Sequence, residues 1–399
     1  MKYKLGTLAT VKGGKRLPKG ISLISTANSH PYIRVRDLSN KRTLELNSDY
    51  QFVDNETQKQ IARYIVQPGN IILSIVGTIG LVAIVGESLE NANLTENCVK
   101  IVATDAVDSK FLYYYLISPI GQAEIAKRTV GAVQAKLPIK NIQDIDVWIP
   151  QKDIQIKIAT MLSCIDDKIE LNNKINENLE RQAQELFKAW FVDFKLFGGE
   201  QPTSWKTVTL DSISELISRG ISPQYTDISN QLVINQKCIR NHVIDLLLAR
   251  THVPKKVNEK WLRFGDLLIN STGNGTLGRA AQIWFEPQNL TVDSHVTIVR
   301  PKNNSLIFYI GLWGITHERE IESLHTGSTG QTELPRNRVK AMELVLPDED
   351  TLYRFNSIIQ PMTSAIVANQ TENQKLVALR DILLPKLMSG EIDVSNIPI

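Results

Sequence analysis

One stretch of the chain is written twice, and this repeat constrains the fold more than any other feature. The residues GAVQAKLPIKNIQDIDVWIP (131–150) align without a gap with STGQTELPRNRVKAMELVLP (328–347). The offset of 197 residues, from 131 to 328, also carries Asn172 to Asn369 and Leu186 to Leu383. A repeat of about half the chain is far too long for a solenoid unit. Each half is therefore predicted to be a domain followed by a helix.

The two halves share one order of predicted elements. Short β-like runs punctuated by glycine, such as YIRVRDL and NIILSIVGTIGLVAIVG, come first, and a helical segment follows. We predict an α+β protein in which two similar mixed α/β domains are joined by two long helices, with an internal pseudo-twofold repeat. The predicted boundaries are 1–150 for the first mixed domain, 151–195 for its helical spacer, 196–204 for a linker, 205–347 for the second domain, 348–390 for its spacer and 391–399 for a tail.

Helix boundary signals divide each helical segment further. Ser163 with Asp166 resembles a helix cap, and Pro361 takes the corresponding place in the second copy. These signals predict a short helix, a break near 163 and 360, and then a long helix. Pro385 and Gly390 are predicted to end the second copy.

Both long helices carry an apolar seam with an asparagine in its middle. Its members, spaced by seven, are Ile165, Asn172, Leu179 and Leu186 in the first copy and Met362, Asn369, Leu376 and Leu383 in the second. Matching seams predict an antiparallel coiled-coil pair in which Asn172 lies near Asn369 and fixes the register. In the alternative interpretation, Asn172 turns to the edge of the seam and meets water. A helix of about 28 residues is about 40 Å long, close to the ~34 Å helical repeat of B-DNA.

Composition excludes several classes of protein. The chain has no apolar run long enough to cross a membrane and no signal peptide core, so a cytoplasmic protein is expected. Cys98, Cys164 and Cys238 are too scattered for a zinc site or a disulfide framework. The net charge is only +3, so the distribution of charge matters more than its total.

No catalytic constellation is found in the sequence. GNGTLG (273–278) matches a dinucleotide-binding fingerprint, but too few residues separate it from Pro287 for the required helix. A Gly-rich turn between two strands is the preferred interpretation. The six histidines show no metal or triad pattern, and neither a phosphate-binding loop nor a nucleophile elbow is present.

Loops that carry Arg, Lys, Asn and Gln can read DNA, because these side chains pair with guanine and adenine edges. Each such residue alone is more often a solvated surface residue, but the candidates recur at matching points of both halves. In the first half they are Lys15, Arg16, Lys19, Arg34, Arg36, Thr78, Gln134, Lys136 and Lys140. In the second half they are Asn235, Gln236, Lys237, Arg240, Thr276, Arg279, Gln331, Arg336 and Arg338.

The sequence resembles the DNA specificity subunits of type I restriction-modification systems. The resemblance rests on KGGKRLPKG, GNIILSIVGTIGLVAIV, GAVQAKLPIKNI, the run KIELNNKINENLE followed by LFKAWFVDF, and LLPKLMSGEI. It implies two target-recognition domains that bind a split, asymmetric DNA sequence, and helices that act as a ruler and dock two methyltransferase subunits. It places Gln134, Thr78, Gln331 and Thr276 near DNA, whereas Glu333, where the first half has Lys136, departs from the pattern.

The resemblance also implies that this chain is a non-catalytic subunit without a cofactor. S-adenosylmethionine, ATP and Mg would be bound by the methyltransferase and restriction subunits. Two other hypotheses stay open: a self-contained DNA-modifying enzyme with a divergent site, and a protein-interaction scaffold with no role in DNA binding. The sequence gives neither the DNA target nor the gap between its halves.

Overall fold

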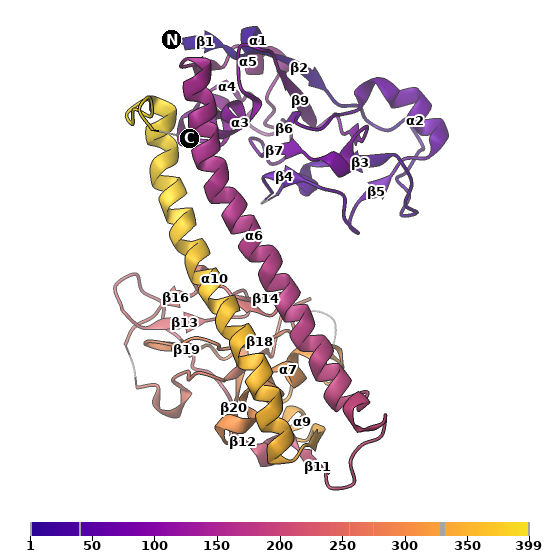
Figure 1. The fold of residues 1–399 in the computed structure, drawn as a ribbon, viewed down its shortest axis with the longest axis vertical. Coiled ribbons are helices and arrows are strands. Elements are labelled where there is room, and N and C mark those ends of the chain that lie inside the picture. Colours follow the sequence, from indigo (N-terminus) through magenta and orange to yellow (C-terminus); the bar gives the residue numbers. More distant parts are fainter. Residues whose placement is uncertain (1, 40, 255, 274, 328–331, 398–399) are drawn as a thin grey trace. The chain divides into compact units, whose positions relative to one another are not determined.

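The computed structural model describes residues 2–39, 41–254, 256–273, 275–327 and 332–397. The chain divides into two compact units, Met1–Glu170 with Gln374–Ile399, and Leu171–Asn373. Two long helices, α6 (Lys152–Phe191) and α10 (Glu349–Ser389), each contribute residues to both units (Figure 1).

The first unit is built on a five-stranded sheet with the order β2-β9-β6-β7-β4, beside a three-stranded sheet β5-β3-β8 and a separate pair β1-β10. The strands are β1 (Lys2–Lys4), β2 (Ala9–Gly13), β3 (Pro31–Ile33), β4 (Thr43–Leu44), β5 (Gln51–Phe52), β6 (Ile71–Ser74), β7 (Val82–Val85), β8 (Asn93–Leu94), β9 (Cys98–Ala103) and β10 (Asp146–Trp148). The helices are α1 (Leu5–Leu8), α2 (Asn55–Ile61), α3 (Ser109–Ile117), α4 (Pro119–Arg128) and α5 (Ile139–Gln143), with a 3₁₀ turn η1 (Val35–Leu38).

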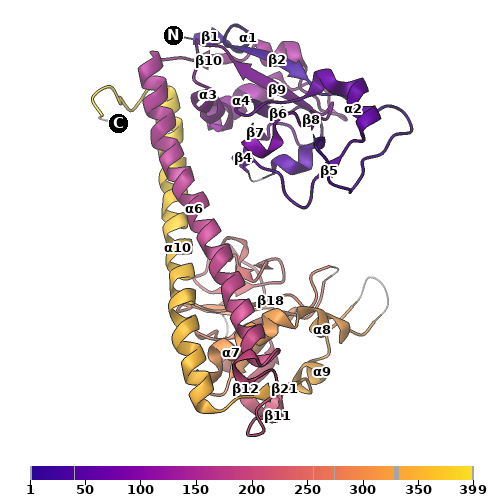
Figure 2. The same ribbon diagram turned by 45° about the vertical axis from the view of Figure 1, so that its right-hand side comes forward.

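Local sequence explains where several of these helices begin. Asp54, Asp108 and Ser118 each accept a hydrogen bond from an early backbone N–H of α2, α3 and α4, respectively. The apolar side chains of α3 then pack on the central strands β6 and β9 in one buried cluster, and Figure 2 shows α3 and α4 beside these strands.

The second unit repeats the arrangement with a four-stranded sheet β12-β20-β17-β18, a three-stranded sheet β16-β13-β19, and two pairs, β11-β21 and β14-β15. Its strands are β11 (Lys206–Thr209), β12 (Ser214–Arg219), β13 (Leu232–Ile234), β14 (Ile239–Arg240), β15 (Val243–Ile244), β16 (Arg250–Thr251), β17 (Leu267–Asn270), β18 (Ala280–Gln282), β19 (Leu290–Val292), β20 (Val296–Pro301) and β21 (Glu343–Leu346). Its short helices are α7 (Ile307–Thr316), α8 (Glu318–Ser323) and α9 (Arg336–Lys340), with a 3₁₀ turn η7 (Asn258–Lys260).

The duplication predicted from the sequence is visible in the sheets. The order β2-β9-β6-β7 in the first unit corresponds to β12-β20-β17-β18 in the second. Each smaller sheet contains one parallel pair, β3 with β8 and β13 with β19. The predicted α+β class, with two similar mixed domains and long helices, is therefore confirmed.

The sequence GNGTLG lies between two antiparallel strands rather than before a helix. It connects β17 to β18, where Leu268 is opposite Ala281. The interpretation of this segment as a turn between strands is confirmed, and no dinucleotide-binding helix follows it.

Two predicted helix breaks are wrong, because α6 and α10 run without interruption past residues 163 and 360. The Ser163 hydroxyl donates to the Ala159 carbonyl within α6 instead of capping a new helix. Pro361 is exposed, so its ring and its missing N–H lie on the outer face of α10. Buried Ile359 and Ile366 hold the helix together on the inner face.

Two residues were predicted to end α10, and the prediction is correct for Gly390 and wrong for Pro385. The helix continues through Pro385 to Ser389. Gly390, with φ of 77°, follows it in the left-handed conformation that glycine adopts readily. Its N–H donates to the carbonyl of Leu387 at 3.3 Å.

The predicted seam residues lie on the side of each helix that faces the other helix. They form only the edge of the buried stripe. Asn172 is fully buried, whereas the other seven predicted seam residues are partly buried: Ile165, Leu179, Leu186, Met362, Asn369, Leu376 and Leu383. Fully buried positions such as Leu162, Ala183 and Ile366 lie beside them. The buried stripe is therefore broader than the heptad positions chosen from the sequence.

The predicted direct pair of Asn172 with Asn369 is wrong, although both asparagines lie between the helices. The Nδ2 of Asn172 donates to the Oδ1 of Asn373 at 2.9 Å and to the Glu372 carboxylate at 2.8 Å. The Nδ2 of Asn369 donates to the Oδ1 of Asn176 at 2.8 Å. Asn172 corresponds to Asn369 and Asn176 to Asn373 at the offset of 197 residues. The bonded pair Asn172–Asn373 is therefore the repeat equivalent of the bonded pair Asn369–Asn176. The two helix segments of the second unit are thus antiparallel with pseudo-twofold symmetry.

In the first unit, charged and polar groups add to the apolar packing that attaches the mixed domain to the helices. Asp166 of α6 accepts hydrogen bonds from the Tyr114 hydroxyl at 2.7 Å and from Arg380 of α10 at 3.0 Å. Arg42 lies 2.9 Å from Glu170. In the second unit the corresponding role is taken by an aromatic cluster in which Phe187 and Phe191 of α6 pack against Tyr309 of α7.

Candidate nucleic-acid interface

Four loops of the first unit meet at one end of its larger sheet. They comprise residues 13–16, 74–80, 94–98 and 130–137. Backbone hydrogen bonds join them: Gly14 N to Cys98 O at 3.0 Å, Ile75 N to Asn97 O at 2.8 Å and Leu137 N to Ile75 O at 3.0 Å. Because the loops are tied to one another and to strand ends, their side chains are presented together on a rigid support.

The second unit gathers the equivalent loops, 219–221, 271–273 with 275–279, 292–296 and 332–334. The bonds that join them are Ile221 N to Val292 O at 2.9 Å, Ser271 N to His295 O at 2.8 Å and Leu334 N to Ser271 O at 2.8 Å. A fifth segment, 235–237, joins them through the Asn270 side chain, which donates to Gln236 O at 3.1 Å.

Lys136 and Glu333 occupy the same backbone position in the two loop clusters. Lys136 forms bridges with Val76 and Val130, and Glu333 forms bridges with Thr272 and Thr326. Both side chains are exposed. One support therefore presents a cation in the first unit and a carboxylate in the second.

A glycine fixes the closest approach within each cluster. A Cβ added to Gly14 would lie 2.0 Å from the Thr95 carbonyl oxygen, and one added to Gly220 would lie 1.9 Å from that of Val292. Any side chain at these positions would push two loops apart.

Five candidates of the first half are brought together on these loops: Lys15, Arg16, Thr78, Gln134 and Lys136. All five are exposed. Their shared position fits a surface that contacts a polyanion.

Arg16 is held by a carboxylate while its side chain remains 80% exposed. Its Nε lies 2.6 Å from Glu96, and this hydrogen bond raises the pKa of Arg16 above its usual value. Burial opposes ionisation of Glu96, but the bond from Arg16 and neighbouring donors leave the pKa of Glu96 lowered overall. The guanidinium is thereby oriented without being covered.

The remaining candidates of the first half lie outside these loops, or their side chains are bonded to other groups of the same unit. Arg34 is only 16% exposed and donates to Asp37, to Gln51 and to the Asp49 carbonyl. Arg36 is 64% exposed and lies 3.7 Å from Asp37. Lys19 and Lys140 are exposed, the first on a loop after β2 and the second on α5.

The candidates of the second half divide in the same way. Arg240, Lys237 and Arg336 are exposed, and Gln236, Thr276 and Arg279 are partly buried. Asn235 is 8% exposed, and its Oδ1 accepts the Lys237 backbone N–H, which shapes the turn. Arg338 donates to the Leu324 carbonyl at the end of α8. Gln331 lies outside the described residues.

Sequence reasoning missed Arg219 and His295 of the second cluster, and also Lys260 of η7, which donates to the Gly220 carbonyl of that cluster. The His295 ring is bonded to the Thr272 hydroxyl at 2.8 Å beside the Gly-rich turn. Arg219 precedes Gly220 as Gly13 precedes Gly14. The glycine that both halves share at this place could have identified Arg219 from the sequence. A search at an offset near 197 could not find it, because Gly220 lies 206 residues after Gly14.

The described residues offer little to a metal or to covalent chemistry. No group of three or more His, Cys, Asp or Glu side chains among them could hold a metal ion. Cys98 and Cys238 are buried free thiols, and burial raises the pKa of Cys98 to about 12 and also raises that of Cys238. Among the helices in the described part of the chain, none is both long and apolar enough to span a membrane.

Comparison with known proteins finds similar sequences and a similar fold. Residues 1–181 match the family described as "Type I restriction modification DNA specificity domain". The MjaIX type I restriction enzyme specificity subunit of Methanocaldococcus jannaschii is 26% identical over 393 residues, covering 92% of this chain and 88% of that protein. The chain is thus similar in sequence to type I specificity subunits.

Two further relatives extend the comparison. The HindI specificity subunit of Haemophilus influenzae is 21% identical over 339 residues, covering 64% of this chain and 71% of its own length. The crystal structure of the type I restriction-modification S subunit from M. genitalium has a TM-score of 0.61 with 17% identity, covering 97% of this chain and 95% of that one. The fold of this chain is therefore similar to that of a solved S subunit.

Proposed function

We propose that the chain is the DNA-recognition subunit of a type I restriction-modification system and reads a bipartite, asymmetric target. The supporting observation is that the two loop clusters share one backbone support but present different side chains, as Lys136 and Glu333 do. A guanine edge accepts hydrogen bonds from lysine, whereas the cytosine amino group donates to a carboxylate. Two such clusters would read two unlike half-sites.

The chain is also proposed to direct methyltransferase and restriction subunits to this target, without catalysing either reaction itself. S-adenosylmethionine, ATP and Mg would then be bound by those subunits. Apolar side chains remain exposed on both long helices: Leu171 and Ile175 of α6 are 52% and 39% exposed, and Leu379 and Ile382 of α10 are 46% and 60% exposed. These residues are suited to packing against partner helices.

The test is to express the chain with its methyltransferase subunits and to map methylated bases by single-molecule sequencing. The expected result is one motif with two specified halves and an unspecified gap. Equal affinity of the reconstituted complex for all duplexes, together with the absence of a split motif, would refute the proposal. The matched control expresses the methyltransferase subunits without this chain, which should leave the genome unmodified at that motif.

A further inference from the structure

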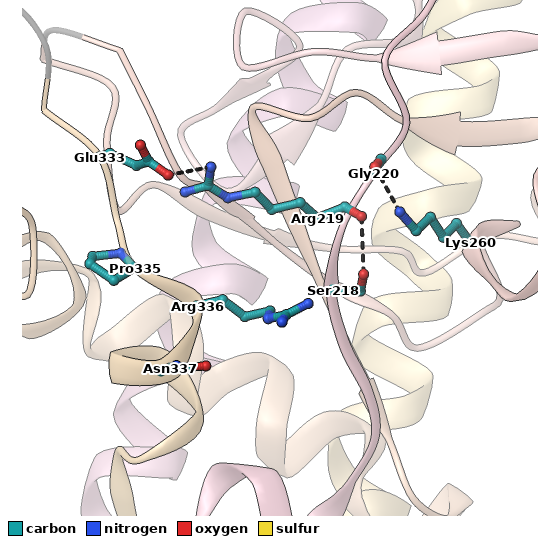
Figure 3. A pocket seen from close by; sticks show the side chains of 8 residues that line it. All are labelled: Ser218, Arg219, Gly220, Lys260, Glu333, Pro335, Arg336 and Asn337. Carbon is teal, nitrogen blue, oxygen red and sulfur yellow. Dashed lines mark hydrogen bonds and ion pairs between the residues drawn. The ribbon is translucent and has the colours of Figure 1, made fainter.

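A basic recess lies in the second unit between the end of β12 and the start of α9. It has a volume of about 400 Å³ and is lined by Ser218, Arg219, Gly220, Lys260, Glu333, Pro335, Arg336 and Asn337. Figure 3 shows the Arg336 side chain extending from α9 toward the strand that carries Ser218 and Arg219. The recess borders the loop cluster through Glu333.

The charges around this recess do not cancel. Arg219 is paired with Glu333 at 2.6 Å and also donates to the Leu334 carbonyl at 2.8 Å. Lys260 donates to the Gly220 carbonyl at 3.0 Å, which leaves its charge uncompensated. Arg336 is exposed and has no hydrogen bond or ion pair within the described part of the chain. Three cations and one carboxylate thus face one recess.

The fold uses only part of this positive charge, through the bonds of Arg219 and Lys260 to backbone carbonyls. Like charges around a common point repel each other, and an exposed cation gains little from a distant carboxylate. An anion bound in the recess would remove the repulsion and would accept bonds from the free donors of Arg336 and Lys260. Arg219, already oriented by Glu333, can still donate through its remaining N–H groups.

The first unit shows what the same place looks like without the two arginines. Gly13 ends β2 as Arg219 ends β12, and each is followed by a close-approach glycine. The offset of 197 carries Ile139 to Arg336. A Cβ on Gly13 would lie 3.5 Å from the Ile139 Cδ1, so these two positions adjoin each other there as well. The first unit brings an apolar side chain to a glycine where the second unit has two arginines.

We propose that this recess seats one backbone phosphate of duplex DNA, held by Arg336 and Lys260 with Arg219 beside them. The inference rests on the proposed function and adds to it the ligand of one site. A phosphodiester carries a full negative charge, whereas a base edge carries none, so the excess positive charge selects the backbone. The contact would position the second unit on DNA without reading sequence.

The experiment compares the wild-type complex of the full-length chain and its methyltransferase subunits with complexes carrying Arg336→Ile, Arg336→Lys or Arg354→Ala. Arg336→Ile introduces the residue that the first unit has at this place. Arg354 is an exposed arginine on α10 and serves as the control. Binding of a fluorescein-labelled random-sequence duplex pool is measured by anisotropy over a series of salt concentrations, and the methylated motif is mapped for each variant.

The expected result for Arg336→Ile is weaker binding and a slope of log affinity against log salt that is shallower by about 1. Its methylated motif should stay that of the wild type, Arg336→Lys should keep the wild-type slope, and Arg354→Ala should change neither. An unchanged slope in Arg336→Ile, or a changed motif, would overturn the phosphate seat while leaving the proposed function standing. Failure of the wild-type complex to bind any duplex would overturn both. Thermal unfolding of each variant confirms that the complex compared is folded.

Discussion

Asn172 and Asn373 join the two long helices of the second unit through their side chains, the Nδ2 of Asn172 lying 2.9 Å from the Oδ1 of Asn373. Asn369 and Asn176 form the symmetry-related bond at 2.8 Å. Asn172 is fully buried, and its own Oδ1 has no hydrogen-bond partner in the described part of the chain. A buried amide with an unpaired oxygen costs stability. We therefore expect these asparagines to specify register rather than to strengthen the pair.

Replacing the pair, Asn172→Leu with Asn373→Leu, should raise the free energy of unfolding by on the order of 1 kcal/mol and allow the helices to slip. Asn172→Leu alone should lower it by about 1 kcal/mol, because it leaves the Asn373 Oδ1 without its donor. Register is checked by electron-spin distances between labels at Lys174 and Thr371, both exposed, with Cys164 replaced by serine.

A single narrow distance distribution is expected for the wild-type asparagines and a broader one for the double variant. Asn178→Leu, at an exposed position of α6, controls for added hydrophobicity alone. An equally narrow distribution in the double variant would show that other contacts set the register.

Asp348 should make the stability of the second unit dependent on pH. Its carboxylate accepts the Thr351 backbone N–H at 2.8 Å and the indole N–H of Trp205 at 2.8 Å. These two bonds lower the pKa of Asp348 below its usual value, and the bond from the Thr351 N–H has the larger effect. A carboxyl whose pKa is lower in the folded state adds stability above its unfolded pKa of about 3.9, and this contribution is lost as pH falls through the folded value.

Asp348→Asn should therefore lower the free energy of unfolding by about 1 kcal/mol at neutral pH, because the amide offers one oxygen where the carboxylate accepts two hydrogen bonds on two oxygens. The difference from the wild type should be constant above about pH 5 and should shrink below about pH 4, since the protonated carboxyl then resembles the amide. Chemical denaturation at a series of pH values measures this difference in the free energy of unfolding. A difference that persists at low pH would mean that shape rather than charge is responsible.

Gly14 should tolerate no side chain, although its neighbour Gly13 should. A Cβ at Gly14 would lie 2.0 Å from the Thr95 carbonyl oxygen, whereas the nearest atom to one at Gly13 is the Ile139 Cδ1 at 3.5 Å. Gly14→Ala should lower the free energy of unfolding by about 1–3 kcal/mol and weaken DNA binding by displacing the loop that carries Arg16. Gly13→Ala should leave both nearly unchanged. If the two variants unfold at the same denaturant concentration, the loops separate more easily than their hydrogen bonds indicate.

The repeat predicted the duplicated α+β fold because sequence similarity at a constant offset reflects similar structure. It could not predict the unbroken helices, since the cap-like Ser163 and the exposed Pro361 are local signals. Packing of Leu162 beside Ser163, and of Ile359 and Ile366 beside Pro361, outweighs these signals. The pairing of Asn172 with Asn373 was missed for a related reason. Symmetry requires only that equivalent residues have equivalent partners, and an antiparallel pair satisfies this without placing Asn172 against its own repeat.

The candidate site was predictable where a motif marks a loop and not where tertiary contacts decide the role of a side chain. Thr78, Gln134 and Lys136 belong to loops that the repeat had already marked. Arg34 has the same composition signal as Arg16, but its guanidinium is bonded within the first unit. Arg219 lies at the end of a strand whose offset differs from that of the rest of the repeat, so no fixed alignment could find it.

Lys136 should influence one position of one half-site. Its backbone is bonded to Val130 in both directions, at 2.9 Å each, so the loop does not depend on its side chain. Lys136→Ala is therefore expected to leave thermal unfolding unchanged and to relax base preference at a single position, a loss of about 1–3 kcal/mol of discrimination. Mapping methylated bases in cells that express the variant complex measures this directly. Lys127→Ala, an exposed lysine at the end of α4, should keep the wild-type motif. Relaxation in both halves, or a uniform loss of methylation without a change in motif, would show instead that Lys136 contacts the DNA backbone.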